Sequence, residues 1–262
     1  MGNNVVMARK VRVLGVQINS VIGDKVKNYQ KVSTLLRENA WFKPDLIVLP
    51  EVFNTGVDHK RFEELAEPVP DQTTMFLSGF AEQFNSYIVG GSFIEKCPDG
   101  KFRNASLVFD RTGKIVAKYH KIHMFSYYGS HEGEVVSSGD RAVVVETDFG
   151  KLGLSICYDL RFPELYRTLA YAGAEILVCP AAWPYPRYDH WITLNKARAV
   201  ENLCYMVSVN QCDQVTLSRT NVGQSMIVNP WGEIIASAGS KEGVLMAEID
   251  LDEIERIRKE FP

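Results

Sequence analysis

Residues 153–167, Gly-Leu-Ser-Ile-Cys-Tyr-Asp-Leu-Arg-Phe-Pro-Glu-Leu-Tyr-Arg, predict a strand that ends at Cys157 and is followed at once by a helix. The strand is indicated by the apolar run over residues 152–156. After the cysteine, apolar residues recur at helical spacing, and Pro163 and Glu164 suit the first turn of a helix. We therefore expect Cys157 to stand at the carboxyl end of a strand and just before a helix.

This position favours a reactive cysteine, because a helix N-terminus stabilises the thiolate and because α/β sheets bind ligands at the carboxyl ends of their strands. The alternative is a buried packing residue, which is the usual role of a free cysteine. The five cysteines are an odd number, scattered and without a Cys-x-x-Cys pair. A disulfide framework and a cysteine-rich zinc site are therefore poorly supported.

The composition is that of an ordinary globular protein. The chain has 262 residues, 46% of them hydrophobic and 23% charged, with a formal net charge of −3. We expect a flexible N-terminal segment over residues 1–10 and a single domain over residues 11–262. No basic block points to nucleic acid or to a membrane surface, and no apolar run is long enough for a membrane span or a signal peptide. These features predict a cytoplasmic protein.

Helical and strand patterns alternate along the chain, with hairpins inserted between them. A strand, a helix and a second strand are predicted over residues 11–49, and this order favours a parallel pair. Strong turn signals predict hairpins around residues 110–114 and 229–233. About a dozen strands are too many for one flat sheet, so the pattern predicts an α/β fold with two mixed sheets packed face to face and helices outside.

Three residues that could carry chemistry each follow a predicted strand: Glu51, Lys121 and Cys157. A base, a cation and a nucleophile at the ends of neighbouring strands could meet at one edge of the fold. Taken singly, a glutamate or a lysine in such a place is usually a solvated loop residue. Position alone therefore makes this group a hypothesis only.

The sequence around these residues resembles the carbon-nitrogen hydrolase (nitrilase) superfamily. Its three signature blocks are matched by Leu-Pro-Glu-Val-Phe at residues 49–53, His-Lys-Ile-His-Met-Phe at 120–125 and Cys-Tyr-Asp-Leu-Arg-Phe-Pro-Glu at 157–164. Further blocks match at residues 180–184, 190–191, 198–202 and 229–233. Within the superfamily the chain is most similar to the ω-amidases, which hydrolyse the terminal amides of short dicarboxylates.

The resemblance implies a four-layer αββα sandwich, a homodimer and a catalytic triad of Glu51, Lys121 and Cys157. It also implies a second glutamate in the pocket. Glu132 is the better match for that glutamate, and Glu134 is close enough to compete.

The chemistry expected of this triad is amide hydrolysis through a thioester, with release of ammonia. Glu51 would take the thiol proton while Cys157 attacks the amide carbon. The Lys121 ammonium and the backbone N–H of Tyr158 would hold the developing oxyanion. No metal and no organic cofactor enters this scheme.

The expected substrate is a small-molecule amide, and its identity is left open. Trp183 could form a wall of the pocket, and Arg161 or Arg187 could pair with a distal carboxylate. Deaminated glutathione, N-carbamoyl amino acids, aliphatic amides and nitriles remain alternatives for the same triad.

Three other readings are weaker. A Cys-His site could recruit His123 or His190, but the resemblance gives these residues no catalytic role. His120, His123 and His131 do not form a zinc-ligand pattern on a rigid element. A catalytically inactive binding subunit is disfavoured because all three triad residue types are present.

Overall fold

The computed structural model describes residues 9–216 and 219–261. Residues 1–8 of the expected flexible segment lie outside the described part. The other two residues of that segment belong to the domain, because Lys10 begins the first strand and Arg9 pairs with Glu175 at 2.8 Å and with Asp252 at 2.9 Å.

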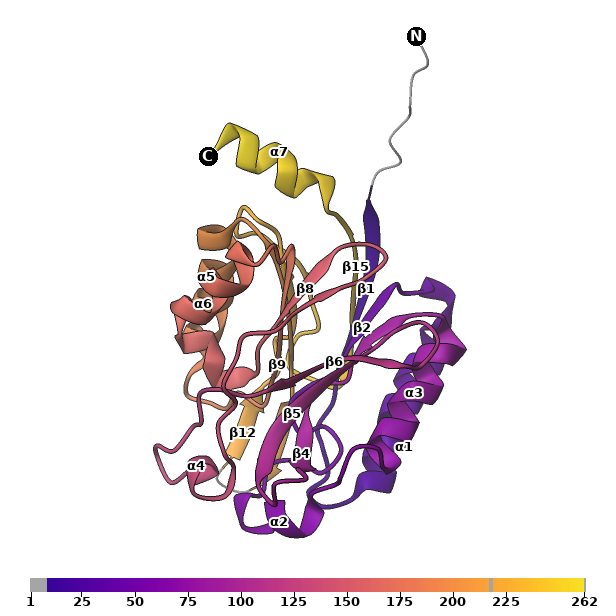
Figure 1. Ribbon diagram of the computed structural model, residues 1–262, viewed down its shortest axis with the longest axis vertical. Coiled ribbons are helices and arrows are strands. Elements are labelled where there is room, and N and C mark those ends of the chain that lie inside the picture. The colour runs from indigo at the N-terminus through magenta and orange to yellow at the C-terminus, as the bar shows by residue number, and fades with distance from the viewer. Residues whose placement is uncertain (1–8, 217–218, 262) are drawn as a thin grey trace.

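The first sheet has seven strands, in the order β15-β1-β2-β3-β5-β4, with β6 also paired to β5. The pairs β1–β2 and β2–β3 are parallel, and the others are antiparallel. Helices α1 and α3 cover one face of this sheet (Figure 1). The elements are β1 (Lys10–Gln17), α1 (Lys25–Glu38), β2 (Leu46–Val48), α3 (Gln72–Phe84), β3 (Tyr87–Val89), β4 (Phe93–Lys96), β5 (Phe102–Phe109), β6 (Ile115–His120) and β15 (Gly243–Asp250).

The second sheet has six strands, in the order β14-β13-β10-β9-β8-β7, with β8, β9 and β10 parallel to one another. Helices α5 and α6 cover its outer face, and α7 (Asp252–Glu260) lies at one end of the molecule (Figure 1). The elements are β7 (Val144–Glu146), β8 (Lys151–Leu154), α5 (Pro163–Tyr171), β9 (Ile176–Ala181), α6 (Tyr188–Asn202), β10 (Tyr205–Asn210), β13 (Met226–Val228) and β14 (Ile234–Ser237).

The two sheets pack face to face, which gives the expected αββα sandwich. Neighbouring residues of β1 point to opposite faces, so Val13 belongs to the core between the sheets and Leu14 to the core under α1 and α3. Both faces are buried, which explains why β1 is continuously apolar over residues 13–16. The longest helix of the described chain, α6, has 15 residues, and none of its helices has the length and hydropathy of a membrane span.

Two details differ from the sequence pattern. The segment over residues 87–93, which reads as a single strand, is divided into β3 and β4, because Gly90 and Gly91 turn the chain between them and Gly91 has a φ of +58°. A two-stranded hairpin that the pattern did not predict, β11 (Cys212–Thr216) with β12 (Arg219–Val222), follows β10.

Short helices mark the end of the sandwich opposite α7 (Figure 1). They are α2 (Phe62–Leu65) and α4 (Glu132–Val135). A pocket at this end is lined by Phe62 of α2, Glu132 of α4 and residues that follow β2, β6, β8 and β9. The fold thus brings the ends of strands from both sheets to one place.

A substitution at Gly91 tests the close packing of the chain against Pro50 at this end of the molecule. A Cβ added at Gly91 would lie 2.0 Å from the Pro50 carbonyl oxygen, beside Glu51, whereas one added at Gly100, with a φ of +78°, would meet open space. Both alanine variants carry the strain of a positive φ, about 1 kcal/mol. Gly91→Ala should lose about 1–3 kcal/mol more in the free energy of unfolding, measured in urea, because of the overlap. Equal losses in the two variants would contradict this packing.

Candidate active site

The pocket between α2 and α4 contains all four residues predicted to be catalytic. It encloses about 530 Å³, partly open to solvent. Glu51, Lys121, Glu132 and Cys157 are buried and line it together. Two of them follow strands of the first sheet and Cys157 follows a strand of the second, so the group exists only when the sheets are packed together.

Cys157 sits at a sharp turn between the strand and the helix. Ile156 is extended, and Cys157 has a φ of +47° and begins a single 3₁₀ turn, Cys157–Arg161, that leads into α5. A non-glycine residue in this conformation is strained, and such strain persists where the surroundings fix it. Here Asp159 fixes the turn, because its carboxylate accepts hydrogen bonds from the Ile156 N–H at 2.9 Å and the Tyr119 hydroxyl at 2.7 Å.

Lys121 is the centre of the charged group. Its Nζ donates to Oε1 of Glu51 at 2.8 Å and to both carboxylate oxygens of Glu132 at 2.9 Å. The Asn104 side-chain amide donates to both carboxylates, at 3.0 and 3.1 Å. The other Glu51 oxygen accepts the backbone N–H of Ala182 at 2.9 Å. These contacts compensate for the removal of three charges from water.

The pKa shifts follow from burial and from these charges. Burial alone would lower the pKa of Lys121, but Glu132 and Glu51 raise it well above its ordinary value, so the group is an ammonium ion. Burial would raise the pKa of Glu51, but the charge of Lys121 and the surrounding hydrogen bonds lower it. Burial and the charge of Glu51 raise the pKa of Cys157 well above its ordinary value. The resting site therefore holds a neutral thiol beside an ionised carboxylate.

The structure distinguishes the two candidate second glutamates. Glu132, the first residue of α4, is buried against Lys121, and its Oε2 also accepts the Phe125 N–H at 2.8 Å. Glu134 lies on the outer side of the same short helix, where its side chain is 71% exposed and pairs with His131. Glu132 is therefore the one that faces the pocket.

The predicted substrate-binding residues also line the pocket. They are Tyr158, Arg161, Trp183 and Arg187. The Arg161 guanidinium lies over the Trp183 ring at 4.7 Å, and that of Arg187 lies over the Phe125 ring at 5.2 Å.

Two lining residues with ionisable side chains were missed by the sequence reasoning, His59 and Arg219. His59 precedes α2, and burial lowers its pKa, so it is neutral at pH 7. Arg219 begins β12, in the hairpin that the pattern did not predict. No sequence signal connects either residue with the triad.

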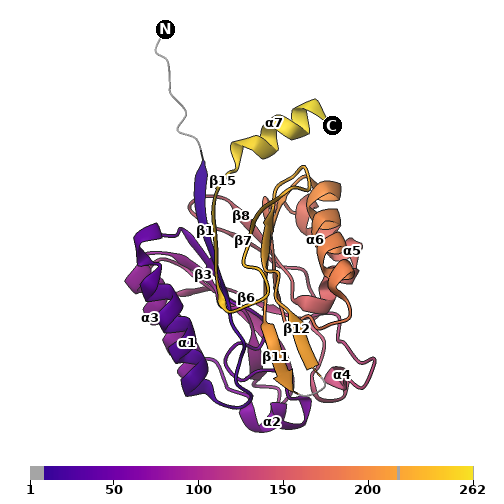
Figure 2. The same cartoon turned by 180° about the vertical axis from the view of Figure 1, so that it is seen from behind.

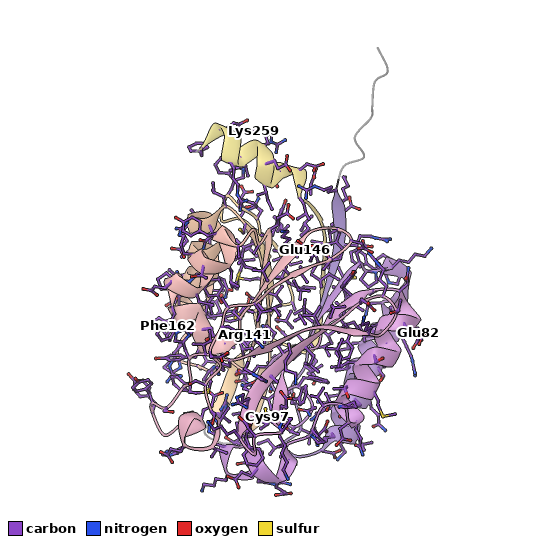
Figure 3. The ribbon with its side chains drawn as sticks, viewed as in Figure 1. Glu82, Cys97, Arg141, Glu146, Phe162 and Lys259 are labelled. Carbon is purple, nitrogen blue, oxygen red and sulfur yellow. The ribbon has the colours of Figure 1, made fainter. Side chains whose placement is uncertain are left out.

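The histidines weighed as alternatives have other partners. Nδ1 of His123 donates a hydrogen bond to Asp159 at 2.7 Å, and its ring stacks on Phe162, the residue labelled beside α5 in Figure 3. His190 is bonded to Arg161 at 3.1 Å and His131 to Glu134. His120 is hydrogen-bonded to Glu95, so the three histidines weighed as a zinc set each have a different carboxylate partner.

A different group could in principle hold a metal ion. Ligand atoms of Glu95, Cys97 and His120 lie within 4.8 Å of one another, with Cys97 at the end of the molecule away from α7 (Figure 3). Glu95 already pairs with Lys118 and, at 2.7 Å, with His120. The carboxylate is therefore neutralised by side chains of the protein itself.

Comparison with known proteins places the chain among enzymes. The carbon-nitrogen hydrolase family matches residues 12–259. Omega-amidase NIT3 of Saccharomyces cerevisiae is 33% identical over 275 residues, covering 100% of this chain and 94% of that protein. Human omega-amidase NIT2 is 34% identical over 259 residues, covering 97% and 92%.

The fold is shared with solved structures of the same kind. The crystal structure of Saccharomyces cerevisiae Nit3, described as a member of branch 10 of the nitrilase superfamily, has a TM-score of 0.90 at 33% identity. The alignment covers 97% of this chain and 94% of that one.

Removal of the central cation should destabilise the protein strongly. In Lys121→Met two buried carboxylates face each other without a counterion, and breaking a buried pair in this way costs about 3–5 kcal/mol of unfolding free energy at pH 7. Without the ammonium, burial would raise the pKa of Glu51 above its unfolded value, so the native variant would bind a proton more readily. Its deficit relative to wild type should shrink as the pH falls from 7 to 5.

Two further variants control this experiment. Lys121→Met combined with Glu132→Gln should recover part of the loss, since one of the two charges is gone. Lys10→Met removes the half-exposed ion pair with Glu248 and should change the unfolding free energy far less. A deficit in Lys121→Met that is independent of pH would argue against the charge explanation.

Proposed function

Because the chain belongs to the carbon-nitrogen hydrolase family and is an amidase-type hydrolase, we propose that Cys157 hydrolyses the terminal amide of a short dicarboxylate through a thioester, with release of ammonia. The observation that carries this proposal is the contact of one buried lysine with two buried carboxylates beside a neutral cysteine. The omega-amidase relatives support the choice of substrate class.

The first half of the proposed reaction transfers the acyl group to sulfur. Glu51 accepts the thiol proton as the Cys157 Sγ forms a bond to the amide carbon. Negative charge moves to the carbonyl oxygen, where the Lys121 ammonium and the backbone N–H of Tyr158 stabilise it. Glu51 then returns the proton to nitrogen, the C–N bond breaks, and ammonia leaves a thioester.

The second half uses the same carboxylate. With ammonia gone, Glu51 takes a proton from water, whose oxygen attacks the thioester carbon. The C–S bond breaks, and the proton held by Glu51 returns to sulfur. Glu132 acts as a positioning residue for Lys121, since both of its oxygens accept from that ammonium.

The raised pKa of Cys157 suits this scheme. Loss of the thiol proton to solvent would leave a thiolate beside ionised Glu51, so the proton stays on sulfur at rest and passes to Glu51 only as the new C–S bond forms. The four substrate-binding residues, Tyr158, Arg161, Trp183 and Arg187, form the walls of the pocket in this proposal.

The first test measures ammonia release from 2-oxoglutaramate by wild type and Cys157→Ala. Glutamine, an N-carbamoyl amino acid, deaminated glutathione, an aliphatic amide and a nitrile are measured in parallel. Turnover of 2-oxoglutaramate should be the fastest and should fall at least 10³-fold in the variant, because the nucleophile is lost. When the reaction is quenched with acid, mass spectrometry should detect the acyl group as added mass on the peptide that contains Cys157.

The other outcomes are informative in different ways. Cys157-dependent turnover of another compound in the panel would keep the mechanism and reject the substrate. Activity that persists in Cys157→Ala would reject the mechanism. Inactivity on the whole panel would favour the reading as a binding subunit.

We also propose that the protein is a cytoplasmic homodimer. Exposed apolar side chains gather at one surface, where the Trp231 ring lies 5.4 Å from that of Phe261 and Gly232 packs beside Val200. Light scattering should give about twice the 29.5 kDa of the chain, and Val200→Glu should shift the mass toward the monomer. A monomer at micromolar concentration, or recovery in a membrane fraction, would reject the respective part of this proposal.

A further inference from the structure

Arg219 is brought to the pocket by a long-range pairing of the chain. It is the first residue of β12, and this strand runs beside the loop that follows β9. The Val222 N–H donates to the Trp183 carbonyl and the Tyr185 N–H to the Thr220 carbonyl, both at 2.9 Å. Figure 2 shows the β11–β12 hairpin reaching toward α4, at the end of the molecule where the pocket lies.

The guanidinium of Arg219 is tied to the catalytic carboxylate through one residue. Its Nη2 donates to the Ala182 carbonyl at 2.9 Å, and the N–H of the same alanine donates to Glu51 at 2.9 Å. The Nε–H of Arg219 is buried and has no hydrogen-bond partner among the described residues. A buried donor on a charged group is rarely left without a partner, so water or a ligand is expected to accept from it.

The pocket as a whole has an excess of positive charge. Lys121 and three arginines, Arg161, Arg187 and Arg219, line it together with only two carboxylates, so its formal net charge is +2. None of the three guanidinium groups forms an ion pair with a carboxylate in the described part of the chain. Such a pocket attracts an anion.

The guanidinium groups of the three arginines differ in the contacts that they make with the described residues. Arg161 lies over the Trp183 ring and is bonded to His190, and Arg187 lies over Phe125. Arg219 keeps a buried Nε–H that has no partner among the described residues. Burial and the nearby charge of Arg187 lower the pKa of Arg219, although an arginine remains a cation at neutral pH. A bound carboxylate would relieve both effects.

We infer that Arg219 binds the distal carboxylate of the substrate and thereby selects amides that carry an anionic group at their far end. The Nε–H and a neighbouring Nη–H of a guanidinium form a fork that matches the two oxygens of a carboxylate. This inference rests on the proposed function for its substrate, but not for the anion site itself. Arg161 and Arg187 then contribute the positive field and the walls.

One experiment measures the binding of an anion at Arg219 without any turnover of substrate. Iodoacetamide alkylates Cys157, and mass spectrometry of the Cys157 peptide gives the rate in the presence of increasing glutarate, a product analogue in which three carbon atoms separate the two carboxylates. Glutarate should protect wild type. In Arg219→Met the glutarate concentration that gives half-maximal protection should rise roughly 10- to 100-fold, as expected for the loss of a charge-assisted hydrogen-bonded pair. The rise in Arg219→Lys should be smaller, because lysine keeps the positive charge.

Matched variants give the comparison. Arg256→Met removes an exposed arginine of α7, at the opposite end of the molecule. Glutarate should protect Cys157 in this variant as it does in wild type. Unchanged protection in Arg219→Met together with lost protection in Arg161→Met or Arg187→Met would overturn the inference. Unfolding curves establish whether each variant is folded. If Arg219→Met does not fold, Arg219→Lys is used in its place.

A second readout separates this inference from the proposed function. The ratio of kcat/KM for glutaramate to that for pentanamide, in which a methyl group stands in place of the carboxylate, should fall roughly 10- to 100-fold in Arg219→Met. If wild type hydrolyses neither amide, the proposed function fails while glutarate protection still reports on Arg219. If wild type prefers glutaramate and both the ratio and the protection are unaffected by Arg219→Met, the inference fails alone.

Discussion

The contact of Lys121 with Glu51 and Glu132 is the interaction on which the rest of the site depends. Three charged groups are removed from water at the centre of the pocket, and each is acceptable there only because the others are present. The glutamates come from the end of β2 and from α4, and the lysine follows β6. A displacement of any of these segments would leave a buried charge unpaired, so the same contact constrains both the fold and the chemistry.

The sandwich explains how such distant residues meet. Glu51 and Lys121 follow strands of the first sheet, and Cys157 follows a strand of the second. The apolar core between the sheets, with Val13 on one side and Val178 on the other, holds these strand ends together. The sharp turn at Cys157 then aims the thiol at the space between the sheets, with Asp159 holding the turn from behind. Apolar packing thus fixes the geometry that the polar residues require.

Much of this arrangement could be predicted from the sequence, because apolar runs mark most of the strands. The triad residues follow these runs, within the signature blocks of the superfamily that the sequence resembles. Two parts could not. Whether Glu132 or Glu134 faces Lys121 depends on the orientation of a four-residue helix, which periodicity over so short a span does not determine. Arg219 lies in a polar hairpin without clear alternation, and it reaches the pocket only through pairing with the loop after β9.

The neutral resting state of Cys157 has a consequence for the lifetime of the protein in an oxidising cell. Peroxide attacks thiolates far faster than thiols, and repeated attack leads to sulfinic and sulfonic acids that are not readily reduced. Because burial and Glu51 keep the proton on sulfur, Cys157 is a poor target for peroxide while the pocket is empty. The carboxylate that we propose as the activating base thus also protects the resting cysteine from oxidation.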